Sequence, residues 1–432
     1  MKLQTSFKRE TVPADLARLA QALIDSDKDK LPDDWGQIAA TTFEPFRLMD
    51  RKIILSDETL GAVSNFEMLA SRCDCLIGTS PFKNALAQLM ARIDGLSVAR
   101  LNDRAADWRL NCYLDYICQL EEVAEQRSSV LPRLVALGMT DIDETTLDAS
   151  LCAHRMEAIE LKSLRGAIPD LITPGYILAL QHAISLIFHP GVPAGLRNWM
   201  PDERRDGPSS AYRPPSPIEL PAFLQDLVTF LNESKLGPSI KVALMHYQIE
   251  ATKMFPVDIE QISRALLVGV WRKSGLIKHV MPPIAITPAL ARRAHHEVLQ
   301  PYRFASGLSE MQMVDEWVYH TARASQNAFE VELLAYTLAN QMVGRWEHAL
   351  ADAGLRVTNT ARELLIALVG SPVFSVSSLS EMLAVSFSTV AKIVTSLEHA
   401  GIITQVSHGR RNKVYECPEA LGLFDAILAE VA

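Results

Sequence analysis

A basic cluster near the C-terminus holds residues that could bind a charged ligand. His408, Arg410, Arg411 and Lys413 lie close together, and Lys392 precedes them. Guanidinium and ammonium groups at this density suit contact with phosphate oxygens or with the minor groove of DNA. These residues are therefore the candidate nucleic-acid-binding residues.

The motifs of common active sites are missing from the sequence. It contains no GxxxxGK[ST] phosphate loop, no GxGxxG turn, no GxSxG elbow and no HExxH pair. The 6 cysteines include no CxxC pair, and Cys73-Asp74-Cys75 is too tightly spaced for a zinc knuckle. The sequence thus predicts no metal site, and so few thiols are typical of a reduced, cytoplasmic protein.

The composition excludes several classes of protein. The chain has 432 residues, of which 48% are hydrophobic and 22% charged, as in a folded chain of several domains. Its net charge of -9 argues against a general binder of nucleic acid or acidic membranes, although a local basic patch remains compatible with it. The longest apolar segment, 176–188, is broken by Gln181 and His182 and is too short to span a bilayer. We therefore expect a cytoplasmic protein with no membrane partner.

The elements that must position these residues are mostly helices. Helix starts are marked by a small polar residue before proline, at Ser80-Pro81, Thr173-Pro174, Ser216-Pro217 and Thr287-Pro288. The clearest is a capping box between Ser216 and Glu219, followed by apolar residues at helical spacing as far as Leu231. The sequence predicts a mainly α architecture.

Two breaks divide the chain into three predicted domains. Residues 201–221 are rich in proline and charge, which predicts an exposed loop. After residues 353–360, short β-branched runs appear for the first time. We predict an N-terminal helical region (1–170), a helical core (171–355) and a C-terminal domain (356–432).

The C-terminal domain has the order of elements of a winged helix-turn-helix, an α+β fold. A helix over about 360–369 leads to a strand at 373–376, and a second helix opens with a capping box between Ser378 and Glu381. After a turn at 384–386, a recognition helix runs from Phe387 to His399, and two β-runs then flank the basic cluster as a wing.

The charge of this domain limits how it could bind DNA. Acids outnumber bases from Asn359 to Ala432, and the recognition helix offers one cation, Lys392, to a groove. The other residues on that face are Phe387, Ser388, Ala391 and Thr395. So few phosphate contacts predict weak binding by a monomer, so DNA binding would need a homodimer. The competing interpretation is that the domain packs on the helical body or on a protein partner.

Residues 237–267 resemble the Fic (Fido) family. The run Ile240–Glu250 leads to Phe255 and then to Ser263-Arg264-Ala265-Leu266-Leu267, and in that family a helix leads into a loop of pattern HPFx[DE]GNGRxxR and then a second helix. Thr173-Pro174 is similar to the start of the family's core, and a winged helix commonly follows that core. The resemblance covers about residues 55–430 and implies a Fic-like helical core at 171–355.

Fic proteins transfer AMP, or a related group, from a nucleotide to a protein hydroxyl, but this chain departs from their motif nearly everywhere. Aligned on Phe255 and Arg264, the motif histidine falls on Lys253 and the metal-binding acid on Val257. The remaining motif positions are Met254 for proline, Asp258, Ile259 and Glu260 for Gly-Asn-Gly, and Gln261 for the first arginine.

These departures have chemical consequences. A lysine, with a pKa near ~10.4, cannot accept a proton from a hydroxyl at neutral pH. Asp258 and Glu260 lack the freedom of glycine and place negative charge where a triphosphate would sit. We therefore interpret the chain as a degraded AMP-transferase, a pseudoenzyme that acts as a binding or regulatory module and needs no cofactor.

Arg264 is the motif arginine that survives. We expect it to form a structural ion pair with Glu250 or Glu260, the other possibility being a solvated position on the helix face. The family's inhibitory glutamate, which pairs with this arginine, falls here on Cys75 or Ile77, and neither side chain can do so.

Two alternatives belong to other functional classes. The first is an active protein adenylyltransferase that uses ATP and Mg²⁺, with Asp258 or Glu260 as metal ligand and His246 or Lys253 nearby. The second is a winged-helix transcriptional regulator whose helical body serves dimerisation or effector sensing.

Overall fold

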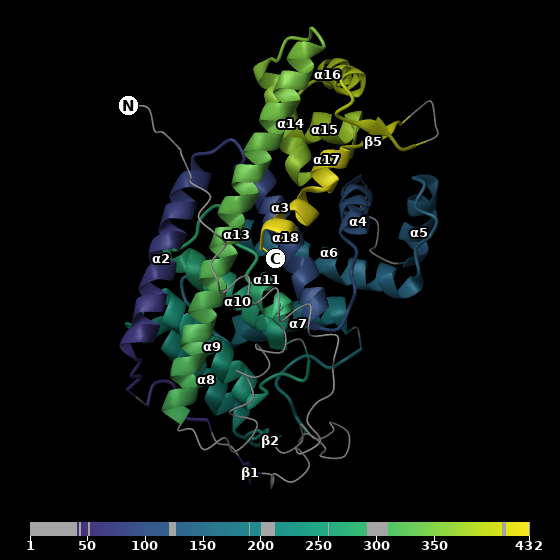
Figure 1. The fold of residues 1–432 in the computed structure, drawn as a ribbon. Helices are drawn as coiled ribbons and strands as arrows, with labels where there is room; N and C mark the ends of the chain where they lie inside the picture. Colours follow the sequence, from purple (N-terminus) through teal and green to yellow (C-terminus); the bar gives the residue numbers. More distant parts are fainter. Residues whose placement is uncertain are drawn as a thin grey trace, which may run out of the picture.

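The computed structural model describes residues 41–42, 45–50, 52–120, 127–189, 191–199, 212–257, 259–291, 310–407 and 412–431. These residues are mainly α-helical, as predicted (Figure 1). Two short strands, β1 (Thr41–Thr42) and β2 (Tyr212–Arg213), pair in parallel. Within the described residues, no helix is both long and apolar enough to cross a membrane.

One hydrophobic core lies between helices from the first and the middle part of the chain. These are α2 (Asp57–Gly78), α7 (Pro174–Phe188), α8 (Leu220–Glu233), α9 (Pro238–Thr252) and α10 (Ile259–Ser274). Buried aromatic side chains fill it, and the rings of Phe66 and Trp271 lie 5.4 Å apart. Burial of such large rings is the main source of stability here.

A second core joins N-terminal helices to the C-terminal segment. It contains residues of α3 (Lys83–Leu101), α4 (Trp108–Leu120), α5 (Arg127–Ala136), α6 (Glu144–Arg165), α11 (Ile286–Leu290) and the C-terminal elements described below. Gly95 allows α3 and α6 to pack closely, because a Cβ atom there would lie 2.4 Å from the carbonyl oxygen of Ala153. Gly370 plays the same part between α3 and the C-terminal segment, where a Cβ would lie 2.8 Å from the oxygen of Ala85.

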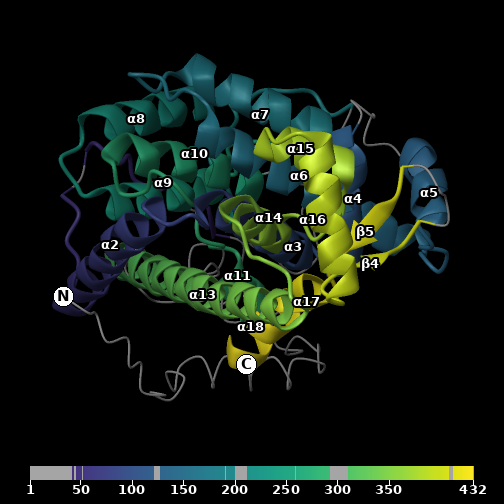
Figure 2. The same cartoon turned by 90° about the horizontal axis from the view of Figure 1, so that it is seen from above.

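The helix α13 (Glu310–Asp352) contributes to both cores. Phe329 belongs to the first core, and residues from Val331 to Leu350 belong to the second. Figure 1 shows α13 running along most of the height of the molecule, and Figure 2 shows α2 beside it. The long helix therefore links the end that holds α8 to the end that holds the C-terminal segment.

The C-terminal segment contains four helices and three strands before its last helix. The elements are α14 (Asn359–Gly370), β3 (Val373–Ser375), α15 (Val376–Leu383), α16 (Phe387–His399), β4 (Thr404–Gln405), β5 (Val414–Glu416), α17 (Pro418–Leu421) and finally α18 (Leu423–Val431). The strands form an antiparallel sheet in the order β3-β5-β4.

The predicted helix starts had mixed outcomes. Thr173 caps α7 as predicted, by accepting a hydrogen bond from the amide of Tyr176, and α16 has the predicted bounds, with Ser386 as its cap. The starts predicted at Ser80 and Thr287 were wrong, because α3 begins at Lys83 and α11 at Ile286, neither with a side-chain cap. The amide of Ser216 donates to Glu219 at 2.9 Å, but α8 begins only at Leu220 because a turn precedes it.

The predicted start of α15 was wrong. The helix begins at Val376, and its capping box joins Ser375 to Ser378 rather than Ser378 to Glu381. Ser375 ends β3 with an extended backbone, so its hydroxyl can accept from the Ser378 amide at 3.1 Å.

Candidate functional site

The loop between α9 and α10 is where the Fic motif would lie, and it begins with a Schellman helix end. Lys253 adopts the left-handed conformation, with φ 46° and ψ 50°. Its amide donates to the oxygen of Glu250 at 3.1 Å, and the amide of Met254 donates to that of Ile249 at 3.3 Å. This pair of bonds defines the motif. Ile249 and Met254 are both fully buried, as its apolar residues usually are.

Arg197 ties this loop to two other segments. Its buried guanidinium donates to the carbonyl oxygens of Lys253 at 2.9 Å and Pro215 at 2.7 Å, and also to that of Trp199. Its backbone amide donates to the oxygen of Met254 at 3.0 Å. The side chain and the backbone of Arg197 therefore both hold the end of α9 in this conformation.

This geometry does not suit phosphate binding. A phosphate cradle presents backbone amides to the anion, and such loops depend on glycine. Here the helix end already uses the amides of Lys253 and Met254, and residues 253–257 include no glycine. From Lys253 to Val257, the described part of the loop is thus a helix stop rather than a cradle.

The other motif positions differ in their surroundings. Phe255, Gln261 and Arg264 are buried, whereas Lys253 and Val257 are partly buried. Asp258 lies outside the described residues, and so do the side chains of Ile259 and Glu260. His246 packs its ring edge-on against Trp317 at 5.1 Å, in contact between α9 and α13.

Arg264 forms a buried ion pair, but with an acid that the sequence did not indicate. Its Nη1 lies 2.9 Å from Oδ2 of Asp94, and both side chains are almost completely buried. The other carboxylate oxygen of Asp94 accepts from the amide of Ala285. The predicted partners were Glu250 and Glu260; Asp94, the partner in this ion pair, lies 170 positions before Arg264. The pair joins α10 to α3 and to the start of α11.

Glu160 of α6 completes this cluster. Burial, together with the charge and hydrogen bond of Asp94, raises the pKa of Glu160 well above its usual range. This environment favours the neutral form of the Glu160 carboxyl group, and Asp94 is the carboxylate that pairs with Arg264.

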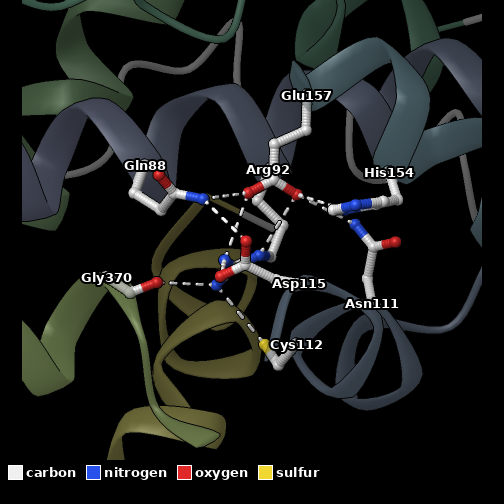
Figure 3. A network of polar contacts seen from close by, with 8 residues as sticks. All are labelled: Gln88, Arg92, Asn111, Cys112, Asp115, His154, Glu157 and Gly370. Carbon is white, nitrogen blue, oxygen red and sulfur yellow. Dashed lines mark hydrogen bonds and ion pairs between the residues drawn. The ribbon is translucent and has the colours of Figure 1, made fainter. Parts of the chain in front are cut away.

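A second buried network surrounds Arg92 of α3 (Figure 3). Its fully buried guanidinium lies 2.8 Å from Asp115 of α4 and 3.1 Å from Glu157 of α6. It also donates to the carbonyl oxygen of Gly370, the last residue of α14, at 2.9 Å. Gln88 donates to both carboxylates. The network joins three helices of the body to the C-terminal segment.

Opposite charges in this network stabilise each other. Burial opposes the charge of Arg92, but Glu157 and its other neighbours keep the arginine pKa above its usual value. Burial likewise opposes protonation of His154, yet Cys118 and Glu157 raise the histidine pKa well above its usual range. Glu157 is buried too, but Arg92 lowers its pKa. The charged groups of the network are thus paired with one another, so it acts as structure and is not suited to hold a charged ligand.

On the side that holds β5 and α17, the C-terminal segment is hydrogen-bonded to α4, which belongs to the helical body formed by the residues before α14. Trp108 donates to the oxygen of Leu421 at 2.7 Å. Arg109 and Tyr113 both donate to Glu416 of β5 at 2.7 Å. These bonds, with the Arg92 contact, hold β5, α17 and the end of α14 in place.

The outer face of α16 is open among the described residues. Phe387, Ser388, Lys392 and Thr395 are exposed, and Ala391 is partly exposed. Figure 1 places α16 near the top of the molecule, and Figure 2, viewed from above, shows it in front. Lys413 is also exposed, whereas His408, Arg410 and Arg411 lie outside the described residues.

Apart from Arg264, the residues that form the two buried networks were not predicted from the sequence. Arg92 and Asp94 lie within an apolar stretch of α3, and Glu157 and Glu160 lie in α6. A charge inside an apolar helix is a usable signal, because buried charges need partners. The identity of the partner depends on which helices pack together, which the local pattern does not contain.

Comparisons with known proteins give likenesses among solved structures. No family model matches this chain, and no curated protein matches it. A similar solved structure is that of a Fic family protein from Desulfovibrio desulfuricans G20, with 13% sequence identity and a TM-score of 0.43. The match covers 85% of this chain and 98% of that one. A likeness of this degree says nothing about activity.

Proposed function

We propose that this chain is a Fic-like protein that has lost nucleotide transfer and binds DNA through a winged helix-turn-helix in residues 356–432. The Fic assignment rests on the residues of α9 and α10 and on the predicted order of three domains. The DNA proposal is carried by one observation: the groove-facing residues of α16 are exposed, while β5 and α17 hold the segment to the body.

This arrangement favours DNA over the interpretation in which the segment only packs on the body. A recognition helix must keep the side chains of its first turns free to reach base edges. Packing on the body uses Glu416 and Leu421 and leaves Ser388, Lys392 and Thr395 exposed. With Lys392 as the one cation of α16 in its first three turns, we expect binding to need two copies of the chain.

We expect Lys392→Ala to weaken DNA binding and to flatten its dependence on salt. Loss of one phosphate contact should reduce the slope of log K against log [salt] by about 0.9. The measurement is fluorescence anisotropy with a labelled duplex over a salt series. Lys235→Ala is the matched control, because Lys235 is an exposed lysine two positions after α8, and Figure 1 shows α8 at the other end of the molecule from α16.

The wing supplies an independent arm of the same test. The double variant Arg410→Ala/Arg411→Ala should lower affinity further if the predicted wing contacts phosphate or the minor groove. If the wild type gave no shift at low salt, or if all variants bound equally well, DNA binding by this segment would be refuted.

Loss of nucleotide transfer is supported by the geometry at the end of α9. The amides of Lys253 and Met254 are used by the helix end, Lys253 replaces the motif histidine, and Arg264 is bound to Asp94. The alternative with an active site at Asp258 or Glu260 would have to bind ATP without these groups.

We expect ATP with Mg²⁺ to bind no more tightly than millimolar and labelled ATP to leave the chain unlabelled. The physical reason is that the amides of Lys253 and Met254 are used by the helix end and that Lys253 stands where the motif has its general base. Calorimetric titration with and without Mg²⁺ measures the first quantity, and autoradiography measures the second. Self-labelling that disappears in Asp258→Ala or Glu260→Ala would contradict the pseudoenzyme proposal and support the active transferase.

A further inference from the structure

Phe387, the first residue of α16, is an unusually exposed aromatic side chain. It leaves 58% of its surface accessible. Val390 and Val394 of the same helix are buried, and the exposed neighbours Ser388 and Lys392 are polar. Among residues 387–394, Phe387 is therefore the large apolar side chain that is exposed.

The start of α16 is held firmly around this residue. The hydroxyl of Ser386 accepts from the amide of Thr389, and it lies 2.8 Å from the Thr389 hydroxyl and 3.2 Å from that of Ser388. These contacts satisfy the cap and fix the backbone of the first turn. Phe387 is thus presented from a defined position rather than from a frayed end.

The charge of α16 favours a polyanion as the partner. The helix contains no acid before Glu398, and Lys392 is exposed five positions beyond Phe387. The hydroxyl groups of Ser388 and Thr389 and the Lys392 cation would not complement an apolar protein surface. DNA offers phosphates for the cation and, in its major groove, one type of apolar group on an unmodified base: the 5-methyl group of thymine.

We infer that Phe387 reads the 5-methyl group of thymine in the major groove and so determines part of the sequence preference of this chain. The inference rests on the proposed DNA binding. Residues at the N-terminal end of a recognition helix contact base edges, and apolar side chains are known to contact the thymine methyl group. Lys392, five positions further along the helix, contacts phosphate, and this contact does not depend on the base sequence.

The test compares two duplexes that differ only in this methyl group, alternating d(AT) and alternating d(AU). We expect the full chain to bind d(AT) about fourfold more tightly than d(AU), the effect of burying one methyl group. Phe387→Ala should bind both duplexes equally, whereas Phe387→Leu should keep part of the preference. Met382→Ala is the matched control, since Met382 is an exposed apolar residue of α15 outside the recognition helix, and it should retain the full preference.

The role of Phe387 can fail without DNA binding failing, and the two failures give different results. Binding of both duplexes with no methyl preference, or a preference that persists in Phe387→Ala, would overturn the role of Phe387 and leave DNA binding intact. Failure of the wild type to bind either duplex would overturn both. A drop in molecular mass of Phe387→Ala in solution, with unchanged d(AT) to d(AU) ratio, would show that the ring serves contact between copies and would overturn the inference.

Discussion

Arg92→Ala is expected to lower the free energy of unfolding by about 3 to 5 kcal/mol, the usual cost of removing one partner from a buried ion pair. The change leaves Asp115 and Glu157 buried without their cation, and it removes the donor from the oxygen of Gly370. Urea unfolding of the full chain measures the effect. Because Gly370 ends α14, we also expect the C-terminal segment to become more susceptible to proteolysis.

The pH dependence of this variant identifies the cause. In the wild type, Arg92 lowers the pKa of Glu157, so the pair contributes stability above the carboxyl's unfolded pKa, and this contribution is lost as pH falls. Without Arg92, His154 still favours the charged form of Glu157, but the raising effect of burial on its pKa loses its main opponent, so the variant should be most impaired at neutral and alkaline pH. The deficit should shrink as pH falls toward the usual pKa of a glutamate.

Arg345→Ala is the matched control. Arg345 also links the body to the C-terminal segment, through Glu419, but its side chain is 59% exposed. An exposed pair contributes little, so we expect a loss below about 1 kcal/mol. Equal effects of the two substitutions would contradict a special role for the buried network.

The helices of this chain were predictable where a cap and an apolar stripe coincide. The turn at 384–386 and the apolar positions of 387–399 indicate α16 at its observed bounds, and Thr173 with Pro174 indicates the start of α7. The start of α15 was misplaced because both Ser375 and Ser378 can cap, and only the end of β3 decides between them. Local chemistry therefore identifies an element more reliably than its first residue.

The candidate site was less predictable, because its decisive contacts join distant segments. The sequence indicated that Arg264 would be paired, but Asp94 lies in a helix that no local pattern connects to α10. The same holds for Arg197, which binds the carbonyl oxygens at the end of α9 from the segment after α7. Lys253 in a left-handed conformation was also unexpected, since this position usually favours glycine.

Both buried networks contain a residue of α3, so the Arg264 pair also stabilises the packing of helices other than α10. Arg92 and Asp94 are two positions apart on α3, and each faces an acid of α6, Glu157 and Glu160 respectively. Gly95 brings α6 close enough for these contacts. The Arg264 contact then connects α10 to the same helix pair.

Arg264→Ala is expected to lower the free energy of unfolding by about 3 kcal/mol. Asp94 would keep the hydrogen bond from the Ala285 amide but lose its cation while remaining buried. The double variant Asp94→Asn/Arg264→Met should recover part of this loss, since asparagine still accepts from the Ala285 amide and the pair then contains no uncompensated buried charge. Urea unfolding measures both. An unchanged stability of Arg264→Ala would contradict the buried pair.

Glu160→Gln tests the same cluster without breaking the Asp94 to Arg264 pair. The pKa of Glu160 is raised in the folded chain, so unfolding at neutral pH releases its proton, and this group's contribution to stability falls as pH rises above the unfolded value. Glutamine can still donate to Asp94 but cannot titrate. The variant should therefore gain on the wild type by at most about 1.4 kcal/mol for each pH unit above the unfolded pKa. A difference that stays constant between pH 5 and pH 8, about three units, would mean that Glu160 is ionised in the folded protein, and Arg264 would then face two carboxylates rather than one.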